Sequence, residues 1–237
     1  GSPRKYVGGD IECDAGCGVV PMKYKDKSYV NALQWAIGLE LFLLLNDPWR
    51  IFLTTDHPNG APFYFYPHLI RLLMDRTFRN EMLEKLHPGA QAATILKSLD
   101  REYSLYEIAI MTRAGPAKSL GLRDRGHLGT GASADITIYE NLADREAMFQ
   151  TPLMVFKSGE LIVKSGQVVK VVAGATHVAR PEYDRGIERT LREYFDRYHT
   201  IRFDNFGISD QEIVDSNCGH TGGECGCVIV QPTGPRI

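Results

Sequence analysis

The residues best suited to chemistry form the run Asp56–Gly60, Asp-His-Pro-Asn-Gly, which directly follows an apolar stretch. Ile51–Leu53 is apolar without alternation, which predicts a buried parallel strand. Such a strand delivers its last side chains to the open end of an α/β sheet or barrel, where functional residues gather. A carboxylate placed there can bind a metal or take a proton from metal-bound water. The alternative is an ordinary turn in which Asp56 caps the next helix, because Asp, Pro, Asn and Gly are also common loop formers.

The preceding residues are predicted to form an αβ unit with this run. Apolar residues recur at helical spacing from Tyr29 to Asn46, at Val30, Leu33, Ile37, Leu41 and Leu44. Asp47-Pro48 ends this helix, and a strand at 49–55 follows it directly.

Two more helices are predicted before residue 121. One covers Pro67–Leu86 and is stopped by His87-Pro88-Gly89; its apolar stripe is Leu69, Leu72, Leu73, Met82 and Leu86. The other runs near Ser104 to Leu120, where Ser104 and Glu107 have the spacing of a capping box.

After Gly121 the pattern changes to short β-type runs separated by glycines, which predicts a small antiparallel sheet. The runs are Ala134–Tyr139, Pro152–Lys157, Leu161–Lys164 and Val168–Val172. Gly159 lies in a short connection of hairpin type, where positive φ is useful. From Tyr183 to Tyr198 the helical period returns, and the tail from Ser216 shows no apolar period.

Composition excludes several classes of function. The 237 residues are 43% hydrophobic and 24% charged, which is typical of a globular protein with a sizeable core. A net charge of -2 and a pI near 6.4 give no electrostatic case for nucleic acid or an anionic membrane. The longest apolar stretch, Ala36–Leu45, is too short to cross a bilayer. We therefore expect neither partner.

The five cysteines do not resemble a secreted disulfide scaffold, so we expect a reducing, cytoplasmic location. Cys13 and Cys17 are interpreted as structural. Cys218, His220, Cys225 and Cys227 lie within ten residues and could ligate zinc, but the usual CxxC pair is missing, so an exposed tail is the alternative. His68, His87, His127, His177 and His199 have no partner at ligand spacing and are interpreted as surface or turn residues.

The string from Leu120 to Ile138, LGLRDRGHLGTGASADITI, resembles the C-terminal signature of the amidohydrolase superfamily. In those enzymes the chain leaves a metal-containing (β/α)8 barrel and completes a small β-sandwich. Here Gly126 and Gly131 supply turns, and Ala134–Ile138 is a strand. The resemblance implies that the following β-type runs belong to the sandwich.

Two further strings, Val30–Phe42 and Leu53–Gly60, look like the A subunit of formylmethanofuran dehydrogenase and of the bacterial formyltransferase/hydrolase complex. The likeness extends from about Val7 to Ile208. It implies a binuclear zinc site that hydrolyses or forms the formamide bond of N-formylmethanofuran in one-carbon metabolism. It also implies a multisubunit complex, in which the charged helix 183–198 either faces solvent or docks a neighbour.

Residue by residue, only Asp56 matches the metal ligands of this family, as the final aspartate of the barrel. The sequence contains no His-x-His, so most zinc ligands are expected outside this chain. The resemblance implies that Asp56 binds one metal, accepts a proton from water and passes it to the leaving amine. His57 and Asn59 are expected to contact substrate. Alternatively, His57 hydrogen-bonds backbone and Asn59 stabilises the turn.

Together these features predict an α/β chain that is the C-terminal part of an amidohydrolase barrel plus a small β-sandwich. We expect barrel residues at 1–120, sandwich at 121–180, a helical segment at 181–215 and an irregular tail at 216–237. Two rival functions remain open. One is another cyclic-amide amidohydrolase resembling dihydropyrimidinase, and the other is a non-catalytic assembly fragment.

Overall fold

The computed structural model describes residues 24–55, 57, 61–172 and 183–207, together with the backbone of strands 177–179 and 228–230. The chain divides into two compact units. One is Val20–Val172, and the other combines Gly1–Val19 with Ala173–Ile237.

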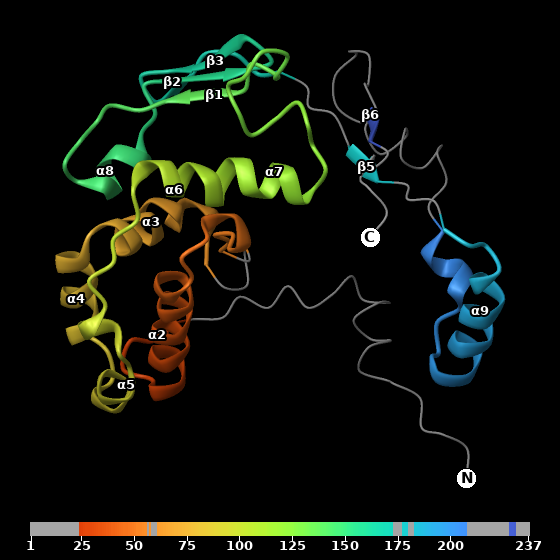
Figure 1. The fold of residues 1–237 in the computed structure, drawn as a ribbon, viewed down its shortest axis with the longest axis horizontal. Coiled ribbons are helices and arrows are strands. Elements are labelled where there is room, and N and C mark those ends of the chain that lie inside the picture. The colour runs from red at the N-terminus through yellow and green to blue at the C-terminus, as the bar shows by residue number, and fades with distance from the viewer. Residues whose placement is uncertain are drawn as a thin grey trace. The chain divides into compact units, whose positions relative to one another are not determined.

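In the first unit, helices and a small sheet form separate layers (Figure 1). The helices are α2 (Tyr29–Leu44), α3 (Tyr66–Met74), α4 (Arg76–Glu84), α5 (Pro88–Ala93), α6 (Leu105–Ala109), α7 (Gly115–Ser119) and α8 (Arg145–Gln150), with 3-10 turns at Pro48–Arg50, Phe63–Phe65 and Leu96–Ser98. The strands are β1 (Ile136–Ile138), β2 (Met154–Lys157), β3 (Glu160–Lys164) and β4 (Gln167–Val168). This mixture of helix and sheet agrees with an α/β class.

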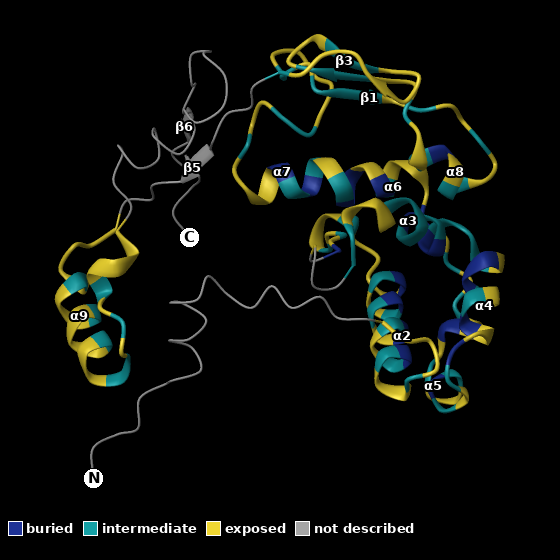
Figure 2. Cartoon of the chain, turned by 180° about the vertical axis from the view of Figure 1, so that it is seen from behind, coloured by how far each residue is buried: buried dark blue, intermediate teal, exposed yellow. Residues whose placement is uncertain are grey.

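The main core lies among the helices. Its buried residues include Leu72 and Leu73 of α3, Leu83 of α4 and Met111. The strands β1–β4 contain only half-buried and exposed residues (Figure 2). The α6–α7 segment runs between the sheet and helices α2–α5 (Figure 1).

Helix α2 confirms the predicted helix at 29–46, but its core-facing side differs from the predicted apolar stripe. The residues that face the core are Ala32, Ala36, Leu39 and Leu43. The exposed apolar residues are Val30, Ile37, Leu41 and Leu44. The helix is therefore apolar on two opposite faces and buries the one that carries two small alanines.

The strand expected at 49–55 is not formed. Asp47 accepts hydrogen bonds from Trp49 N and Arg50 Nε, both at 3.1 Å, and this cap starts a 3-10 turn with Pro48 at its first position. The backbone then becomes extended at Ile51 (φ -138°, ψ 133°). No described residue pairs with 51–55 as a neighbouring strand, and a strand needs such a partner for its backbone hydrogen bonds.

The single helix predicted at Pro67–Leu86 is two helices, because Asp75 breaks it. Asp75 adopts extended backbone (φ -130°, ψ 98°), and its side chain accepts a hydrogen bond from Phe78 N at 2.8 Å as the N-cap of α4. His87-Pro88-Gly89 also does more than end a helix. His87 caps α5 by accepting from Gly89 N at 3.0 Å.

Arg79 of α4 is fully buried and hydrogen-bonds to the backbone at three positions. Its guanidinium donates to the carbonyls of Leu72 at 3.0 Å and of Leu99 and Arg101 at 3.1 Å. Burial lowers the pKa of this guanidinium, although it stays charged. The arginine therefore replaces solvent as the hydrogen-bond donor to these three carbonyls.

The helix predicted near 104–120 has the expected extent and contains a π turn at Ile110–Ala114 between α6 and α7. The capping box of Ser104 and Glu107 is confirmed. Pro116 has no N–H, so the carbonyl of Thr112 lacks its usual helical donor. Arg113 Nη1 donates to that carbonyl at 3.0 Å instead.

The predicted antiparallel sheet is confirmed, in the order β1-β2-β3-β4. Ser158 (φ 51°) and Gly159 (φ 82°) form the turn between β2 and β3, which matches the hairpin expected at Gly159. β4 is shorter than the predicted run, and α8 between β1 and β2 was not predicted. Membership of this sheet in a sandwich stays a prediction.

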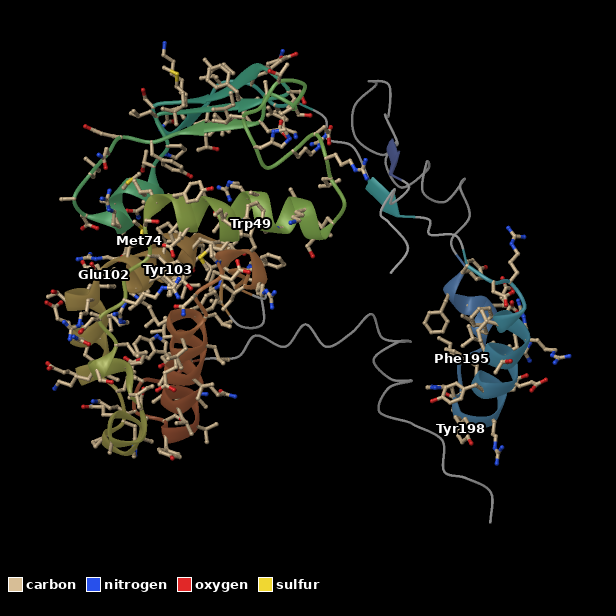
Figure 3. The ribbon with its side chains drawn as sticks, viewed as in Figure 1. Trp49, Met74, Glu102, Tyr103, Phe195 and Tyr198 are labelled. Carbon is tan, nitrogen blue, oxygen red and sulfur yellow. The ribbon has the colours of Figure 1, made fainter. Side chains whose placement is uncertain are left out.

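In the second unit, α9 (Ile187–Tyr198) confirms the predicted helix at 183–198. Phe195 packs edge-to-face on Phe203 and Phe206 of the 3-10 turn Phe203–Phe206, at ring-centroid distances of 5.8 and 5.3 Å. Figure 3 labels Phe195 and Tyr198 on this helix. β5 (His177–Ala179) and β6 (Val228–Val230) pair in parallel, so the expectation of an irregular tail is wrong at 228–230.

Candidate functional site

The two residues that flank the Asp56–Gly60 run are joined by a backbone hydrogen bond. Ala61 N donates to Thr55 O at 2.8 Å, and Thr55 is buried. Asp56 and Asn59 lie outside the described residues, whereas His57 is described. The residues on either side of the predicted site run, Thr55 and Ala61, are therefore within hydrogen-bond distance of each other.

The segment before this loop is anchored against α7. Lys118 Nζ lies 5.1 Å from the ring centroid of Trp49, which Figure 3 labels. A Cβ at Gly115 would come within 2.7 Å of Phe52 Cε1, so the Phe52 ring packs directly on the helix backbone. Glycine at position 115 permits this approach.

His57 makes a backbone hydrogen bond, as the alternative interpretation expected. Its Nδ1 accepts from Phe63 N at 3.3 Å, and its ring meets Phe63 edge-to-face at 5.2 Å between centroids. Because Nδ1 holds the acceptor lone pair, the neutral ring carries its proton on Nε2. His57 thus presents an N–H donor, and in this arrangement it offers no lone pair to a metal.

The four histidines whose side chains are described away from this loop have structural contacts. His68 Nδ1 lies 3.3 Å from Glu146 Oε2, and His87 caps α5. His127 accepts from Gly129 N through Nδ1 at 3.1 Å, while its Nε2 lies 2.9 Å from Arg123 O. His199 stacks on Phe195 at 4.7 Å. The interpretation of these four as surface or turn residues agrees with the structure.

The described residues do not form a metal centre. Among them, no group of three or more His, Cys, Asp or Glu side chains is placed to hold an ion. The candidate cysteines Cys13, Cys17, Cys218, Cys225 and Cys227 and His220 lie outside the described part of the chain. A binuclear centre is therefore not assembled from residues 24–55, 57, 61–172 and 183–207.

Asp135, which lies in the predicted strand Ala134–Ile138, accepts hydrogen bonds from several charged and backbone groups. It accepts hydrogen bonds from Lys157 Nζ at 2.7 Å, Arg125 Nη1 at 3.2 Å and Ser158 N at 2.8 Å. Partial burial raises the pKa of Asp135, but the bonds from Lys157 and Ser158 and the charges of Lys157 and Arg125 together hold it below its ordinary value. It joins the glycine-rich loop before β1 to the β2–β3 turn. In the sequence, only the position of Asp135 between the apolar residues Ala134 and Ile136 indicated that its charge could be partly buried.

A cavity of about 320 Å³ is lined in part by Leu53, which precedes the Asp56–Gly60 run in the sequence. Its apolar lining is Leu53, Pro67, Ile70 and Phe149. Its polar lining is Tyr66, Thr112, Arg113 and Tyr139. These residues come from five separate stretches of sequence, so no local motif could have identified the cavity.

In the described part of the chain, no helix has the length and apolar character needed to span a membrane.

Comparisons with known proteins agree on one family. The model of the amidohydrolase family matches residues 2–170. The A subunit of the formyltransferase/hydrolase complex Fhc from Methylorubrum extorquens is 45% identical over 210 residues, covering 88% of this chain. Protein FwdA of Methanocaldococcus jannaschii is 42% identical over 219 residues, covering 87%.

A solved structure agrees with these relatives. It is the crystal structure of the formyltransferase/hydrolase complex FhcABCD from Methylorubrum extorquens in complex with methylofuran. One of its chains superposes with a TM-score of 0.72 at 42% identity over 90% of this chain. This chain spans 38% of the length of each of these three relatives. It belongs to the amidohydrolase family.

Proposed function

We propose that this chain is the C-terminal part of an amidohydrolase subunit that acts on the formamide bond of N-formylmethanofuran-type substrates. The reaction is formylmethanofuran plus water to or from methanofuran plus formate, in cytoplasmic one-carbon metabolism. The observation that carries the proposal is the 45% identity with the Fhc relative over 88% of this chain. The barrel and sandwich architecture is part of the proposal.

The proposed partners are the other subunits of a multisubunit complex. The solved relative is a complex of this kind, bound to methylofuran. Similarity to the Fhc relative favours the bacterial formyltransferase/hydrolase type. Similarity to FwdA, at 42% identity, keeps the archaeal dehydrogenase type, an oxidoreductase complex, as the second form.

The proposal includes a binuclear zinc centre, with Asp56 as one ligand and most ligands outside this chain. When bound, such ions supply an acidified water and polarise the formyl carbonyl. The role proposed for Asp56 in this chain is to accept a proton from water and return it to the leaving amine. A short carboxylate suits this shuttle, because it is both a hard oxygen ligand and a proton acceptor.

His57 and Asn59 are proposed to contact substrate. Since Phe63 N occupies His57 Nδ1, the remaining Nε2–H is a donor suited to a carbonyl or carboxylate oxygen. Beside His57, the Phe63 and Tyr64 rings are 63% and 68% exposed. Exposed aromatic faces of this kind suit contact with a planar ring such as a furan.

The two rival functions predict different chemistry. A dihydropyrimidinase-like enzyme would open a cyclic amide, and an assembly fragment would hydrolyse nothing. The relatives at 42–45% identity are named for formyl-group complexes or as FwdA, and none of these names refers to cyclic amides.

The deciding experiment measures zinc content and formate release from N-formylmethanofuran in the full-length protein that carries this chain. The proposal expects formate production and two zinc ions in each copy of that protein. Opening of dihydrouracil without formate release would support the cyclic-amide rival. Absence of both metal and activity in a protein that still joins its complex would support the assembly role.

A further inference from the structure

The cavity of about 320 Å³ combines donors and apolar surface that the described residues do not use among themselves. It lies between α3, the π turn, the end of β1 and α8, which supply Ile70, Arg113, Tyr139 and Phe149 respectively. Its volume falls within the range of small-molecule sites, which begins at roughly 300 Å³.

Arg113 contributes a positive charge to this cavity, and no acidic side chain among the described residues forms an ion pair with it. Arg71, Arg101 and Arg125 each form an ion pair with a carboxylate. No carboxylate of the described residues lies within ion-pair distance of Arg113, whose hydrogen bond goes to the carbonyl of Thr112. Arg113 is exposed at the cavity lining, and its other N–H donors have no acceptor in the described part of the chain.

Two phenols add further donors. Tyr66 and Tyr139 line the cavity and are half-buried. Within the described residues, neither hydroxyl has a hydrogen-bond partner. Thr112, in contrast, donates its hydroxyl to Ile108 O at 2.6 Å. The donors left for a ligand are therefore a guanidinium and two phenols, a set that matches an anion such as a carboxylate.

The apolar side of the cavity favours a particular kind of group for the uncharged part of the ligand. Phe149 meets Tyr139 edge-to-face at 5.1 Å between ring centroids, and Ile70 is buried beside them. Aromatic and branched aliphatic side chains favour a flat apolar group. The π turn that carries Arg113 agrees with a ligand site, since such turns occur frequently at functional sites.

We propose that this cavity binds an aryl carboxylate, with its carboxylate on Arg113, Tyr66 and Tyr139 and its ring against Phe149 and Ile70. The proposal goes beyond the formamide reaction and does not depend on Asp56. Binding is measured without turnover, so failure of the hydrolase proposal would not decide this one.

The test is isothermal titration of the protein that carries this chain with benzoate and with benzamide, its neutral isostere. Benzoate is expected to bind at least about 10-fold more tightly than benzamide, because charge-assisted hydrogen bonds are the stronger ones. Arg113→Gln is expected to weaken benzoate binding about 10-fold and to leave benzamide nearly unchanged. Tyr66→Phe and Tyr139→Phe are each expected to weaken benzoate binding about 3-fold.

The matched control is Arg50→Gln, which removes one positive charge from an exposed ion pair with Asp47 that does not line the cavity. Near-UV circular dichroism confirms that each variant is folded. Failure of the folded protein to bind benzoate, equal affinity for benzoate and benzamide, or equal losses in Arg50→Gln and Arg113→Gln would each overturn the proposal.

A competition experiment with benzoate tests whether the bound aryl carboxylate is part of the substrate or a separate ligand. If the aryl carboxylate is part of the substrate, benzoate inhibits formamide hydrolysis competitively. If it is a separate ligand, benzoate binds with the same Arg113 dependence but does not compete. Both results support the site, and they assign it to different molecules.

Discussion

His57 and Phe63 are joined by a hydrogen bond from the Phe63 backbone N–H to His57 Nδ1, at 3.3 Å. The bond assigns the neutral tautomer without reference to any ligand, because a backbone N–H can only donate. In this arrangement neither ring nitrogen of His57 has a free lone pair for a metal ion. The proposed function therefore uses His57 only through its Nε2–H.

Replacement of His57 tests this donor role. His57→Ala is expected to raise KM for the formyl substrate about 3- to 10-fold with a smaller effect on kcat, because one hydrogen bond is worth about 0.5–1.5 kcal/mol. His57→Gln keeps an N–H donor and is expected to recover most of the affinity. Steady-state kinetics of both variants checks this, and equal defects in the two would argue against the donor role.

Asp56→Asn tests the proposed proton shuttle. The amide keeps the size of the side chain but cannot accept the proton, so kcat is expected to fall about 100- to 10,000-fold. Asp47→Asn is the matched control, since asparagine also caps a helical turn and Asp47 lies outside the loop. Near-normal formate release by Asp56→Asn would remove Asp56 from the base role.

Two glycines of the family signature differ in a way that stability measurements can detect. Gly126 and Gly131 both have positive φ, 76° and 86°. A Cβ at Gly126 would also lie 2.7 Å from Ala117 Cβ and 2.9 Å from Arg113 O, whereas no described atom lies within 4 Å of one at Gly131.

Gly131→Ala is therefore expected to cost about 1 kcal/mol from backbone strain alone. Gly126→Ala adds a steric overlap and is expected to cost about 3 kcal/mol. Thermal unfolding of the two variants measures the difference. Equal costs would mean that the loop shifts to accommodate the methyl group at Gly126.

Asp135→Asn is expected to destabilise the sheet by about 1.5–3 kcal/mol, because it weakens charged hydrogen bonds to Lys157 and Arg125. The pKa of Asp135 is lowered in the folded state, so its contribution is present above the unfolded value near 3.9 and is lost as pH falls through the folded pKa. Melting temperatures at pH 7 and pH 3 check this. The loss on acidification should be smaller in Asp135→Asn than in the parent protein.

Local patterns predicted much of the fold. The capping box of Ser104 and the hairpin at Gly159 were readable because the contacts involved lie within a few residues. The break at Asp75 was missed because apolar residues on both sides keep a helical period. Only the preference of aspartate for the N-cap indicated the break.

The site was less readable, because its contacts join distant residues. The strand at 49–55 was inferred from apolar composition, which does not supply the neighbouring strand that pairing requires. The cavity is lined by Arg113 together with Tyr66 and Tyr139, each more than 25 residues from Arg113 in sequence. The position of Asp56 after an apolar run made it a candidate, but only the family resemblance favoured a metal-binding role over that of an ordinary turn residue.

The exposed apolar face of helix α2 is expected to promote self-association of the isolated chain. Val30, Ile37, Leu41 and Leu44 are 45–60% exposed and follow one line along the helix. Copies of the isolated chain should attract one another through this line, so light scattering should rise with concentration more steeply than for a chain with a polar line. Replacing Ile37 and Leu41 by glutamate should flatten that rise and leave the opposite, buried face intact.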